Sequence, residues 1–225
     1  MKNKIIDLIR RNEGLRKIFL GFSLWLNNFS YGMIKVFVLE NGIHPKHRIM
    51  NYHQFFLDNI QAGETVLDIG CGNGAVAADL AAKAGKVAGI DIAEKNIKAA
   101  REKYSLPNLE FVLGDCLIFD FSRLGIKKFD KIILSNVLEH LDRRERFLQG
   151  LHKLSDTILL RAPLVTRDWL AVYKKEHGYK YKLSADHRIE YTEDILQDEL
   201  ARSGWRIKTQ KIIFGEVWAA VVNNQ

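Results

Sequence analysis

A short apolar segment runs directly into a glycine-rich turn in Val66-Leu67-Asp68-Ile69-Gly70-Cys71-Gly72-Asn73-Gly74. The first half has the pattern of a short buried strand, and the alanine-rich run at 75–84 is typical of a helix. Glycines at a strand-to-helix junction let the backbone turn tightly and approach a ligand. The segment therefore predicts a ligand-binding loop at the carboxyl end of a parallel strand.

Strands and helices alternate from residue 64 to the end of the chain. Predicted strands cover 65–70, 86–91, 109–115, 129–135, 157–162, 205–213 and 217–222. Predicted helices cover 75–84, 94–103, 143–154 and 192–203, the last with Thr192 as its N-cap. This order predicts an α/β fold, a doubly wound seven-stranded sheet that is mostly parallel with an antiparallel C-terminal edge strand pair. The long connection at 165–191 is expected to be a lid.

The N-terminal segment 1–59 is predicted to be helical and to form a domain apart from 60–225. Apolar residues recur at steps of three and four on one helix face: Leu15, Ile18, Phe22, Leu26, Phe29, Met33 and Val36. Gly14, Gly21 and Gly32 weaken a helix by up to about 1 kcal/mol each. We therefore expect two or three shorter helices here, and another at about 46–59.

Charge is concentrated in the same segment. Residues 1–50 hold nine Lys or Arg against three Asp or Glu, which accounts for +6 of the net +7. The body is nearly neutral, so nucleic-acid binding is disfavoured. The longest apolar run, at 18–26, is shorter than the ~18 to 20 residues of a membrane-spanning helix. Two cysteines, Cys71 and Cys116, indicate a reducing compartment, and we expect a cytoplasmic protein.

Further polar residues fall at the ends of the next predicted strands. Asp91 ends the second strand, Asp115-Cys116 follows the third, and Ser135-Asn136-Val137-Leu138-Glu139-His140-Leu141 follows the fourth. The spacing Gly70-x-Gly72-x-x-Ala75 also satisfies the loose dinucleotide pattern. An NAD site explains the glycines and Asp91, but it has no evident use for Asp68 or Asp115.

Together these motifs resemble those of the class I S-adenosylmethionine-dependent methyltransferases, in particular the small-molecule and quinone-biosynthesis subgroup. VLDIGCGNG, GID, GDC, SNVLEHL and LLRAPL occur in that family's order, and the resemblance covers about residues 60–222. It implies a Rossmann-like fold, while residues 1–45 lie outside the resemblance. It also implies methyl transfer from S-adenosylmethionine, with S-adenosylhomocysteine as product, to oxygen rather than nitrogen or carbon of a small-molecule or lipid-linked acceptor.

The resemblance assigns the cofactor to residues of the strand ends. It places Gly70, Cys71, Gly72 and Gly74 against the methionine and ribose, and Asp68 near the amino group. Asp91 would bind the ribose hydroxyls with Ile92 beside the adenine, and Asp115 and Cys116 would bind the adenine edge. Ser135 and Asn136 would line the methyl-transfer side, and Tyr52 and His53 would fold over the cofactor.

An oxygen acceptor needs a general base, for which histidine is well matched near neutral pH. His140 and His187 are the candidates for this catalytic role. The lid residues Trp169, Tyr173, Arg188 and Tyr191 are expected to contact the acceptor, or alternatively to pack on the core. No group of residues has metal-ligand spacing, so we expect no metal. A Mg²⁺-assisted mechanism stays open as an alternative, although no paired acidic motif favours it.

The N-terminal segment allows two interpretations. Its apolar face packs as a cap over the acceptor pocket, or residues 1–37 bind an anionic membrane surface through Lys2, Lys4, Arg10, Arg11, Arg16 and Lys17. The second interpretation places the protein at the cytoplasmic face of a membrane. Two other functions stay open, a module that binds S-adenosylmethionine without transferring methyl groups and an NAD-dependent enzyme. The sequence leaves the oligomeric state undetermined.

Overall fold

The computed structural model describes residues 2–40 and 44–224 and has two compact units, with the boundary between Ile49 and Met50. In the first unit, α1 (Lys2–Arg11) and α2 (Glu13–Phe37) are separated at Asn12, whose side chain accepts a hydrogen bond from the Leu15 N–H at 3.0 Å. This cap begins the second helix. The expected division into shorter helices is confirmed, but it falls at Asn12, and α2 continues through all three glycines because each costs only about 1 kcal/mol in a long helix.

Aromatic side chains form a row along α2. Phe22, Trp25 and Phe29 stack, with ring centroids 5.9 and 5.6 Å apart, and each is more than half exposed. The side chains of Lys2 and Lys4 lie outside the part of the chain that the structure describes. Within the described part, no helix has the length and apolar character to cross a membrane.

The predicted helix at 46–59 is two helices. α3 (Lys46–Met50) and α4 (Tyr52–Asp58) are divided at Asn51, which has a left-handed φ of 48°. Tyr52, Phe55 and Phe56 of α4 are buried in the core of the second unit. The boundary between the units therefore lies before α4, ten residues earlier than the one expected at residues 59 and 60.

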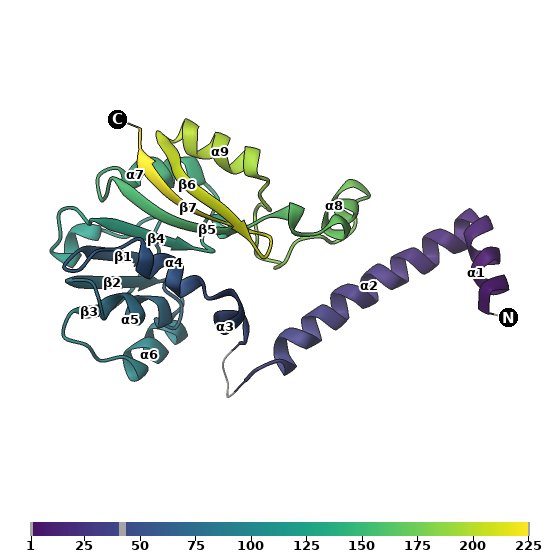
Figure 1. Cartoon of the computed structure of the whole chain (residues 1–225), viewed down its shortest axis with the longest axis horizontal. Coiled ribbons are helices and arrows are strands. Elements are labelled where there is room, and N and C mark those ends of the chain that lie inside the picture. The colour runs from purple at the N-terminus through teal and green to yellow at the C-terminus, as the bar shows by residue number, and fades with distance from the viewer. Residues whose placement is uncertain (1, 41–43, 225) are drawn as a thin grey trace. The chain divides into compact units, whose positions relative to one another are not determined.

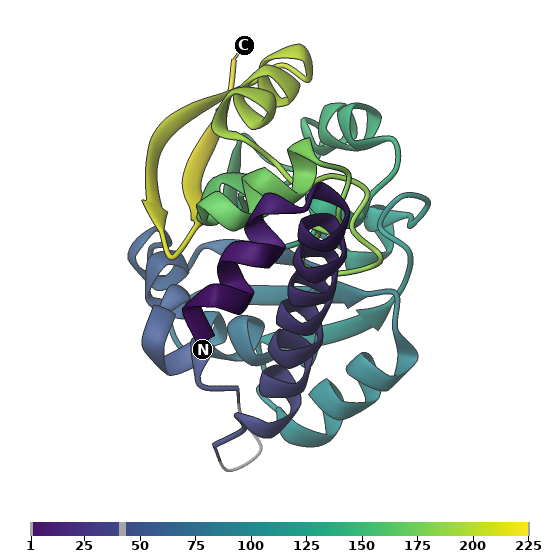
Figure 2. The ribbon, with the colours of Figure 1, turned by 90° about the vertical axis from the view of Figure 1, so that its right-hand side faces the viewer.

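The second unit is built on a seven-stranded sheet with the order β3-β2-β1-β4-β5-β7-β6 (Figure 1). The strands are β1 (Thr65–Ile69), β2 (Lys86–Asp91), β3 (Leu109–Leu113), β4 (Lys131–Ser135), β5 (Thr157–Pro163), β6 (Trp205–Ile213) and β7 (Glu216–Asn223). The first five are parallel, and β7 runs antiparallel to β5 and β6. This confirms the predicted sheet, with every strand bound within two residues of its expected position, and Figure 2 shows the β6–β7 pair at its edge.

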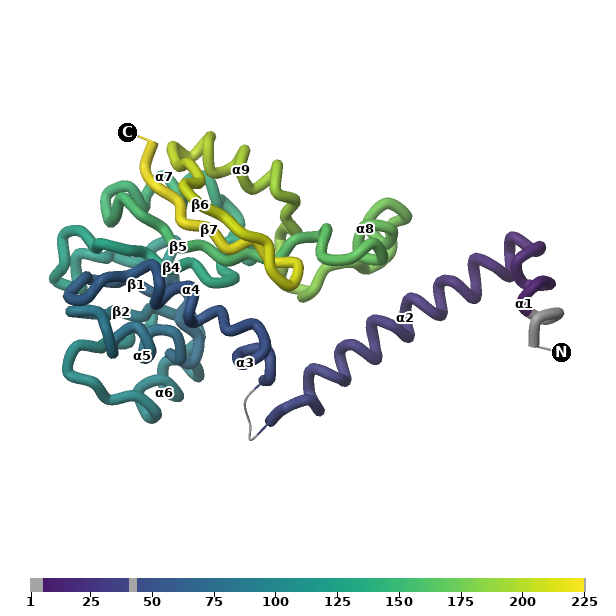
Figure 3. Tube along the Cα trace, viewed as in Figure 1, coloured from purple at the N-terminus to yellow at the C-terminus, as the bar shows by residue number. Residues whose placement is uncertain are grey.

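Helices cover both faces of the sheet, as the chain trace in Figure 3 shows. One face packs on α4, α5 (Ala75–Ala81) and α6 (Glu94–Lys103), and the other on α7 (Arg144–Leu151) and α9 (Glu193–Arg202). Thr192 caps α9 as predicted, because its Oγ1 accepts a hydrogen bond from the Ile195 N–H at 3.3 Å. Short 3-10 turns occur at η1 (Phe121–Leu124), η2 (Leu138–His140) and η3 (Val165–Arg167).

The predicted lid at 165–191 is partly helical and firmly attached at its end. It contains η3 and α8 (Trp169–Glu176). Tyr191 forms an isolated parallel bridge with Leu164, and its carbonyl accepts a hydrogen bond from the Val165 N–H at 2.7 Å. The two ends of the segment are therefore held together beside the sheet.

Candidate functional site

The glycine-rich loop follows β1, and its three glycines differ in what a side chain at each position would contact. Gly70, Gly72 and Gly74 all have left-handed φ values, 73°, 56° and 79°. A Cβ at Gly70 would lie 2.7 Å from Val137 Cγ2, and one at Gly74 would lie 2.5 Å from the Phe111 ring. A Cβ at Gly72 would meet nothing within 4 Å. Gly70 and Gly74 are therefore required by packing, whereas Gly72 leaves the backbone open to a ligand.

Asp91 holds this loop in place. Its Oδ2 accepts a hydrogen bond from the Gly72 N–H at 2.9 Å, and its Oδ1 accepts from the Ala93 N–H at 2.8 Å and from Asn96 Nδ2 at 3.1 Å. The neighbouring Ile92 is 70% exposed. A carboxylate at a strand end beside an exposed apolar side chain suits a ribose and its base, which agrees with the roles predicted for the two residues.

The third strand end contributes Asp115 and Cys116. Asp115 Oδ1 accepts a hydrogen bond from the Leu117 N–H at 2.9 Å. Burial, reinforced by the charge of Asp115, raises the pKa of the Cys116 thiol to about 12, and burial also raises the pKa of Cys71. Both side chains are thus neutral thiols near neutral pH, and neither is an activated nucleophile.

Asp68 is a buried carboxylate of the strand ends that lacks a full set of partners and could bind a ligand. It is 1% exposed, and its Oδ2 has no hydrogen-bond partner among the described residues. Burial, reinforced by the nearby Asp91, raises its pKa to about 8. A buried carboxylate without a partner is costly, and an ammonium group at this place would stabilise its charged form.

Arg161 is a site residue that the sequence analysis missed. It is 3% exposed in β5, where its Nε lies 3.0 Å from Glu216 Oε2 and 3.2 Å from Asn136 Oδ1. Its Nη1 has no partner among the described residues, and its guanidinium lies 3.6 Å from the centre of the Tyr52 ring. The sequence does contain a signal for this residue, namely an arginine within the apolar strand at 158–162. Charged side chains are rarely buried unless they have a partner.

The two residues predicted to fold over the cofactor have clear partners within the chain. Tyr52 is buried; burial raises its pKa, Arg161 opposes the rise, and Glu216 and Asp68 add to it. His53 Nδ1 lies 2.6 Å from Asp79 Oδ2 on α5, the helix that follows the glycine-rich loop. His53 thus ties α4 to α5, and a cofactor contact by either residue stays a prediction.

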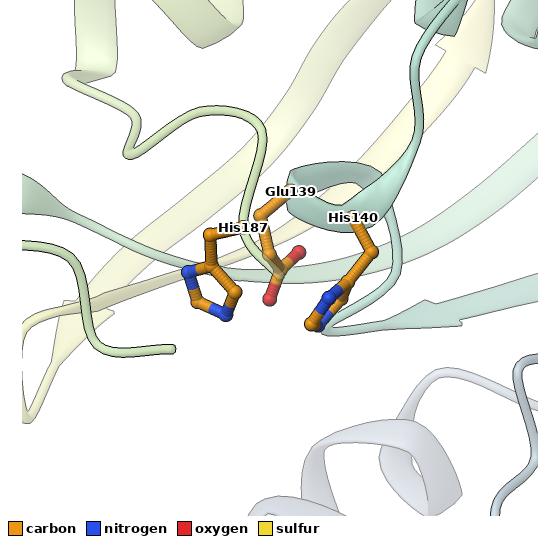
Figure 4. A group of neighbouring side chains, drawn as sticks. All are labelled: Glu139, His140 and His187. Atoms are coloured by element: carbon orange, nitrogen blue, oxygen red, sulfur yellow. The ribbon is translucent and has the colours of Figure 1, made fainter. Parts of the chain in front are cut away.

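Glu139, His140 and His187 form a cluster of side chains that point toward one another (Figure 4). Asn136, after β4, has a left-handed φ of 58°, a conformation that asparagine tolerates better than most residues. The chain turns there into η2, Val137 packs on Gly70, and Glu139 becomes fully buried. Both His140 and His187 approach the Glu139 carboxylate, although His187 lies 47 positions after His140.

Each imidazole of the cluster is paired with a carboxylate behind it. His140 Nδ1 lies 3.0 Å from Asp186 Oδ2, and His187 Nδ1 lies 2.9 Å from Glu190 Oε1. Glu190 is buried, which raises its pKa, but hydrogen bonds from His187 and the Leu183 N–H outweigh this and hold the pKa below its usual value. Since a carboxylate only accepts, Nδ1 carries the proton and the Nε2 lone pair of each ring is available.

The predicted lid residues divide into exposed and buried ones. Trp169 is 76% exposed, Tyr173 stacks on His177 with centroids 4.1 Å apart, and Arg188 Nε lies 3.2 Å from Asp142 Oδ1. Tyr191 differs from the acceptor contact that we expected. Its ring is fully buried, and its hydroxyl donates to Glu199 Oε1 at 2.6 Å, so the alternative of packing on the core holds for this residue.

A cavity of about 740 Å³ lies between the segment after β3 and α7. It is lined by residues 115–122 and by residues of 142–154. It shares Asp115 and Cys116 with the predicted cofactor site but includes neither the glycine-rich loop nor Asp91. The strand ends, with their unpartnered polar atoms, are therefore the better candidate for the site.

The fold and this arrangement define the class: a Rossmann-like sheet with its ligand site at the carboxyl ends of the parallel strands. A family model described as "Methyltransferase domain" matches residues 60–197. The chain therefore belongs to this family of S-adenosylmethionine-dependent methyltransferases, which favours S-adenosylmethionine over NAD as its cofactor. The unpartnered Asp68 and the open face of Gly72 fit that cofactor.

Curated proteins and solved structures agree with this assignment. N-methyltransferase 4 of Papaver somniferum is 30% identical over 60% of this chain and 43% of its own length. Ubiquinone biosynthesis O-methyltransferase of Chromobacterium violaceum is 29% identical over 56% of each chain. The chain thus spans about half the length of these relatives. Magnesium protoporphyrin IX methyltransferase from Synechocystis, solved with bound SAH, shares the fold at a TM-score of 0.63 and 19% identity, over 99% of this chain and 100% of that one.

Proposed function

We propose that the protein transfers a methyl group from S-adenosylmethionine to an oxygen atom of a small-molecule or lipid-linked acceptor. One observation carries this proposal, the presence of two kinds of group at one edge of the sheet. Asp68 and Gly72 offer an unpartnered carboxylate and an open backbone. His140 follows Val137, which packs on Gly70, by three residues, and the centre of the His187 ring lies 4.6 Å from that of the His140 ring.

The cofactor residues bind and align. Bound S-adenosylmethionine supplies a methyl group on a positively charged sulfur, so the protein has mainly to align the acceptor and exclude water. Asp68 pairs with the ammonium group, Asp91 accepts hydrogen bonds from the ribose hydroxyls, and Asp115 accepts one from the adenine. Arg161, with its unpartnered Nη1, is placed in the same network as Tyr52 and suits the carboxylate of the methionine moiety.

The histidines favour oxygen as the acceptor atom. A hydroxyl must lose its proton as it is methylated, whereas a neutral amine is already nucleophilic. Burial lowers the pKa of His140 despite the opposing charge of Asp186, so this imidazole is neutral near pH 7 and able to receive a proton. The relatives include O-methyltransferases and N-methyltransferases, so their names alone leave the acceptor atom open.

Methyl transfer to matched acceptors tests the proposal. The purified full chain is incubated with S-adenosylmethionine carrying a labelled methyl group and with pairs of compounds that differ only in a hydroxyl or an amine. We expect label on the hydroxyl members and a loss of about 10²-fold or more in rate for His140→Gln. His177→Gln, at the exposed end of α8, is the matched control. Label on the amines alone contradicts the oxygen assignment, and cofactor binding without label on any compound favours the silent binding module.

The lipid-linked acceptor is favoured by the composition of the first unit. Phe22, Trp25 and Phe29 form an exposed row on α2, and the chain before them carries Arg10, Arg11, Arg16 and Lys17. Such a helix binds anionic lipid through its charges while its rings enter the interface. We expect the full chain to float with anionic liposomes, and salt to release it. Trp25→Ser with Phe29→Ser should abolish flotation, whereas Trp169→Ser, at a tryptophan of the other unit that is even more exposed, should not. Equal flotation of all three proteins contradicts this part of the proposal.

A further inference from the structure

The Glu139 carboxylate is fully buried, and neither of its oxygens has a hydrogen-bond partner among the described residues, which is unusual for a charged group. Burial raises its pKa to about 7. Isolated buried carboxylates are costly, and native chains keep them where a cation or a metal ion compensates.

The two side chains that approach this carboxylate are histidines, a residue type that commonly binds metal ions. Glu139, His140 and His187 each offer one ligand atom, and these atoms lie within 4.8 Å of one another (Figure 4). Three ligand atoms at about 2.0 to 2.1 Å from one ion lie about 3.3 to 3.6 Å from one another. A closure of up to about 1.5 Å therefore converts the cluster into a coordination sphere. The His140 and His187 rings, with centroids 4.6 Å apart, already stand at 89° to each other.

The surroundings of the two imidazoles have the form that metal sites use. Asp186 and Glu190 hold the Nδ1 atoms, which leaves Nε2 of His140 and His187 as the ligand atoms. Ser184 Oγ donates a hydrogen bond to Asp186 Oδ1, which orients that carboxylate toward His140. The backbone is tied as well, since the Arg188 N–H donates to the Glu139 carbonyl at 2.6 Å.

We propose that Glu139, His140 and His187 bind one divalent transition-metal ion, and that this ion takes the acceptor hydroxyl as a further ligand. Two imidazoles and one carboxylate suit zinc or manganese better than magnesium or calcium, which prefer oxygen ligands alone. Three protein ligands leave coordination positions open. The second clause of this inference rests on the proposed function, whereas the first does not.

The ion gives the cluster a way to activate the acceptor that differs from proton transfer to a histidine. A hydroxyl bound to the ion has a lowered pKa and releases its proton to water. The oxygen lone pair then forms the bond to the methyl carbon, and the electrons of the broken sulfur–carbon bond stay on sulfur. The metal ion keeps its oxidation state throughout, and no further reactant is consumed.

Direct metal binding is the primary test, because it needs no acceptor. The untagged full chain is stripped with a chelator and titrated with Zn²⁺ by calorimetry and with Mn²⁺ by the loss of the free-ion paramagnetic resonance signal. We expect one ion per chain. Glu139→Gln and His187→Gln should each weaken binding by about 100-fold or more, and Asp186→Asn, which loosens His140, by about 10-fold. His177→Gln should bind as the unaltered chain does.

The variants allow folding to be separated from ligation. Glu139→Gln removes a buried charge that has no hydrogen bond to lose, so we expect it to melt no lower than the original chain and to keep the affinity for S-adenosylhomocysteine. The inference is overturned when the stripped chain binds neither ion at millimolar concentration, or when folded Glu139→Gln binds as tightly as the original. Stoichiometric binding with turnover that chelators leave unchanged overturns only the role in acceptor activation. Metal binding without methylation of any acceptor means that the proposed function has failed while the metal site stands.

Discussion

The glycine-rich loop and the cluster of Glu139, His140 and His187 lie at the same edge of the sheet, yet the chain builds them in opposite ways. The loop is nine consecutive residues whose geometry follows from three glycines and a strand. The cluster joins η2 to the end of the 165–191 segment, 47 positions further on. A local motif can be interpreted from sequence because its neighbours are known, whereas an assembled cluster needs the fold that brings its parts together.

The largest expected effect separates two glycines of the same loop. Gly74→Ala would place a methyl group 2.5 Å from the Phe111 ring at a φ of 79°, so we expect a loss of about 3 kcal/mol or more in the free energy of unfolding. Gly72→Ala meets open space and should lose only about 1 to 2 kcal/mol from its left-handed φ.

For the loss of affinity for S-adenosylhomocysteine we expect the opposite order, with the larger loss in Gly72→Ala. The new methyl group at Gly72 occupies the face through which the cofactor approaches, so we expect its affinity for S-adenosylhomocysteine to fall by about 10-fold or more. Urea unfolding and calorimetry measure the two quantities. Equal destabilisation of both variants, or normal affinity in Gly72→Ala, contradicts the division of the loop into packing and binding glycines.

Asp68 should link stability to pH. Its pKa is about 8 in the folded chain, above the usual value of 3.8, so the folded state holds a proton that the unfolded state has lost. Stability from this residue is therefore present below about pH 4 and is lost as pH rises towards 8. Asp68→Asn removes that loss, and we expect its melting temperature to exceed that of the original by about 5 °C or more at pH 8 but not at pH 4.

The same substitution should weaken the cofactor site. The amide cannot pair as an anion with the ammonium group, so affinity for S-adenosylhomocysteine should fall by about 10-fold. In the original chain, binding near pH 7 should release a proton, which calorimetry in buffers of different ionisation enthalpy detects. A variant that is no more stable at pH 8 and binds normally shows that Asp68 is neither strained nor a ligand residue.

These residues also show how much the sequence could predict. The strand positions, the glycine-rich loop and Asp91 were all predictable, because each depends on periodicity or on contacts between neighbouring strands and the loops that follow them. Glu139 lies in the motif SNVLEHL and Arg161 in LLRAPL, but the sequence analysis assigned neither residue a role. Their burial without a full set of partners arises from packing across β4, β5 and the 186–191 segment, which no local pattern encodes.

Substitution of Asp91 tests the part of the cofactor site that the sequence predicted. Its carboxylate accepts hydrogen bonds from Gly72, Ala93 and Asn96, so it orders the loop and offers the ribose a partner. Asp91→Ala should weaken binding of S-adenosylhomocysteine by about 10-fold or more, equal to about 1.4 kcal/mol. Asn96→Ala loosens the same carboxylate without removing it and should have a smaller effect. Unchanged affinity of Asp91→Ala in calorimetry contradicts the ribose assignment.

The smallest effect concerns Tyr191, which belongs to the core even though its sequence neighbours suggested a lid. Tyr191→Phe removes one hydrogen bond to Glu199, while Arg144 Nε stays 2.9 Å from that carboxylate. We expect a loss of about 1 to 2 kcal/mol, a melting temperature lower by roughly 2 to 8 °C, and unaltered binding of S-adenosylhomocysteine and of Zn²⁺. Trp169→Phe, an exposed substitution in α8, should leave the melting temperature within about 2 °C. Because His187 and Tyr191 end the same segment, a Tyr191→Phe chain that keeps its stability but loses Zn²⁺ would show that the position of His187 depends on the hydrogen bond between Tyr191 and Glu199.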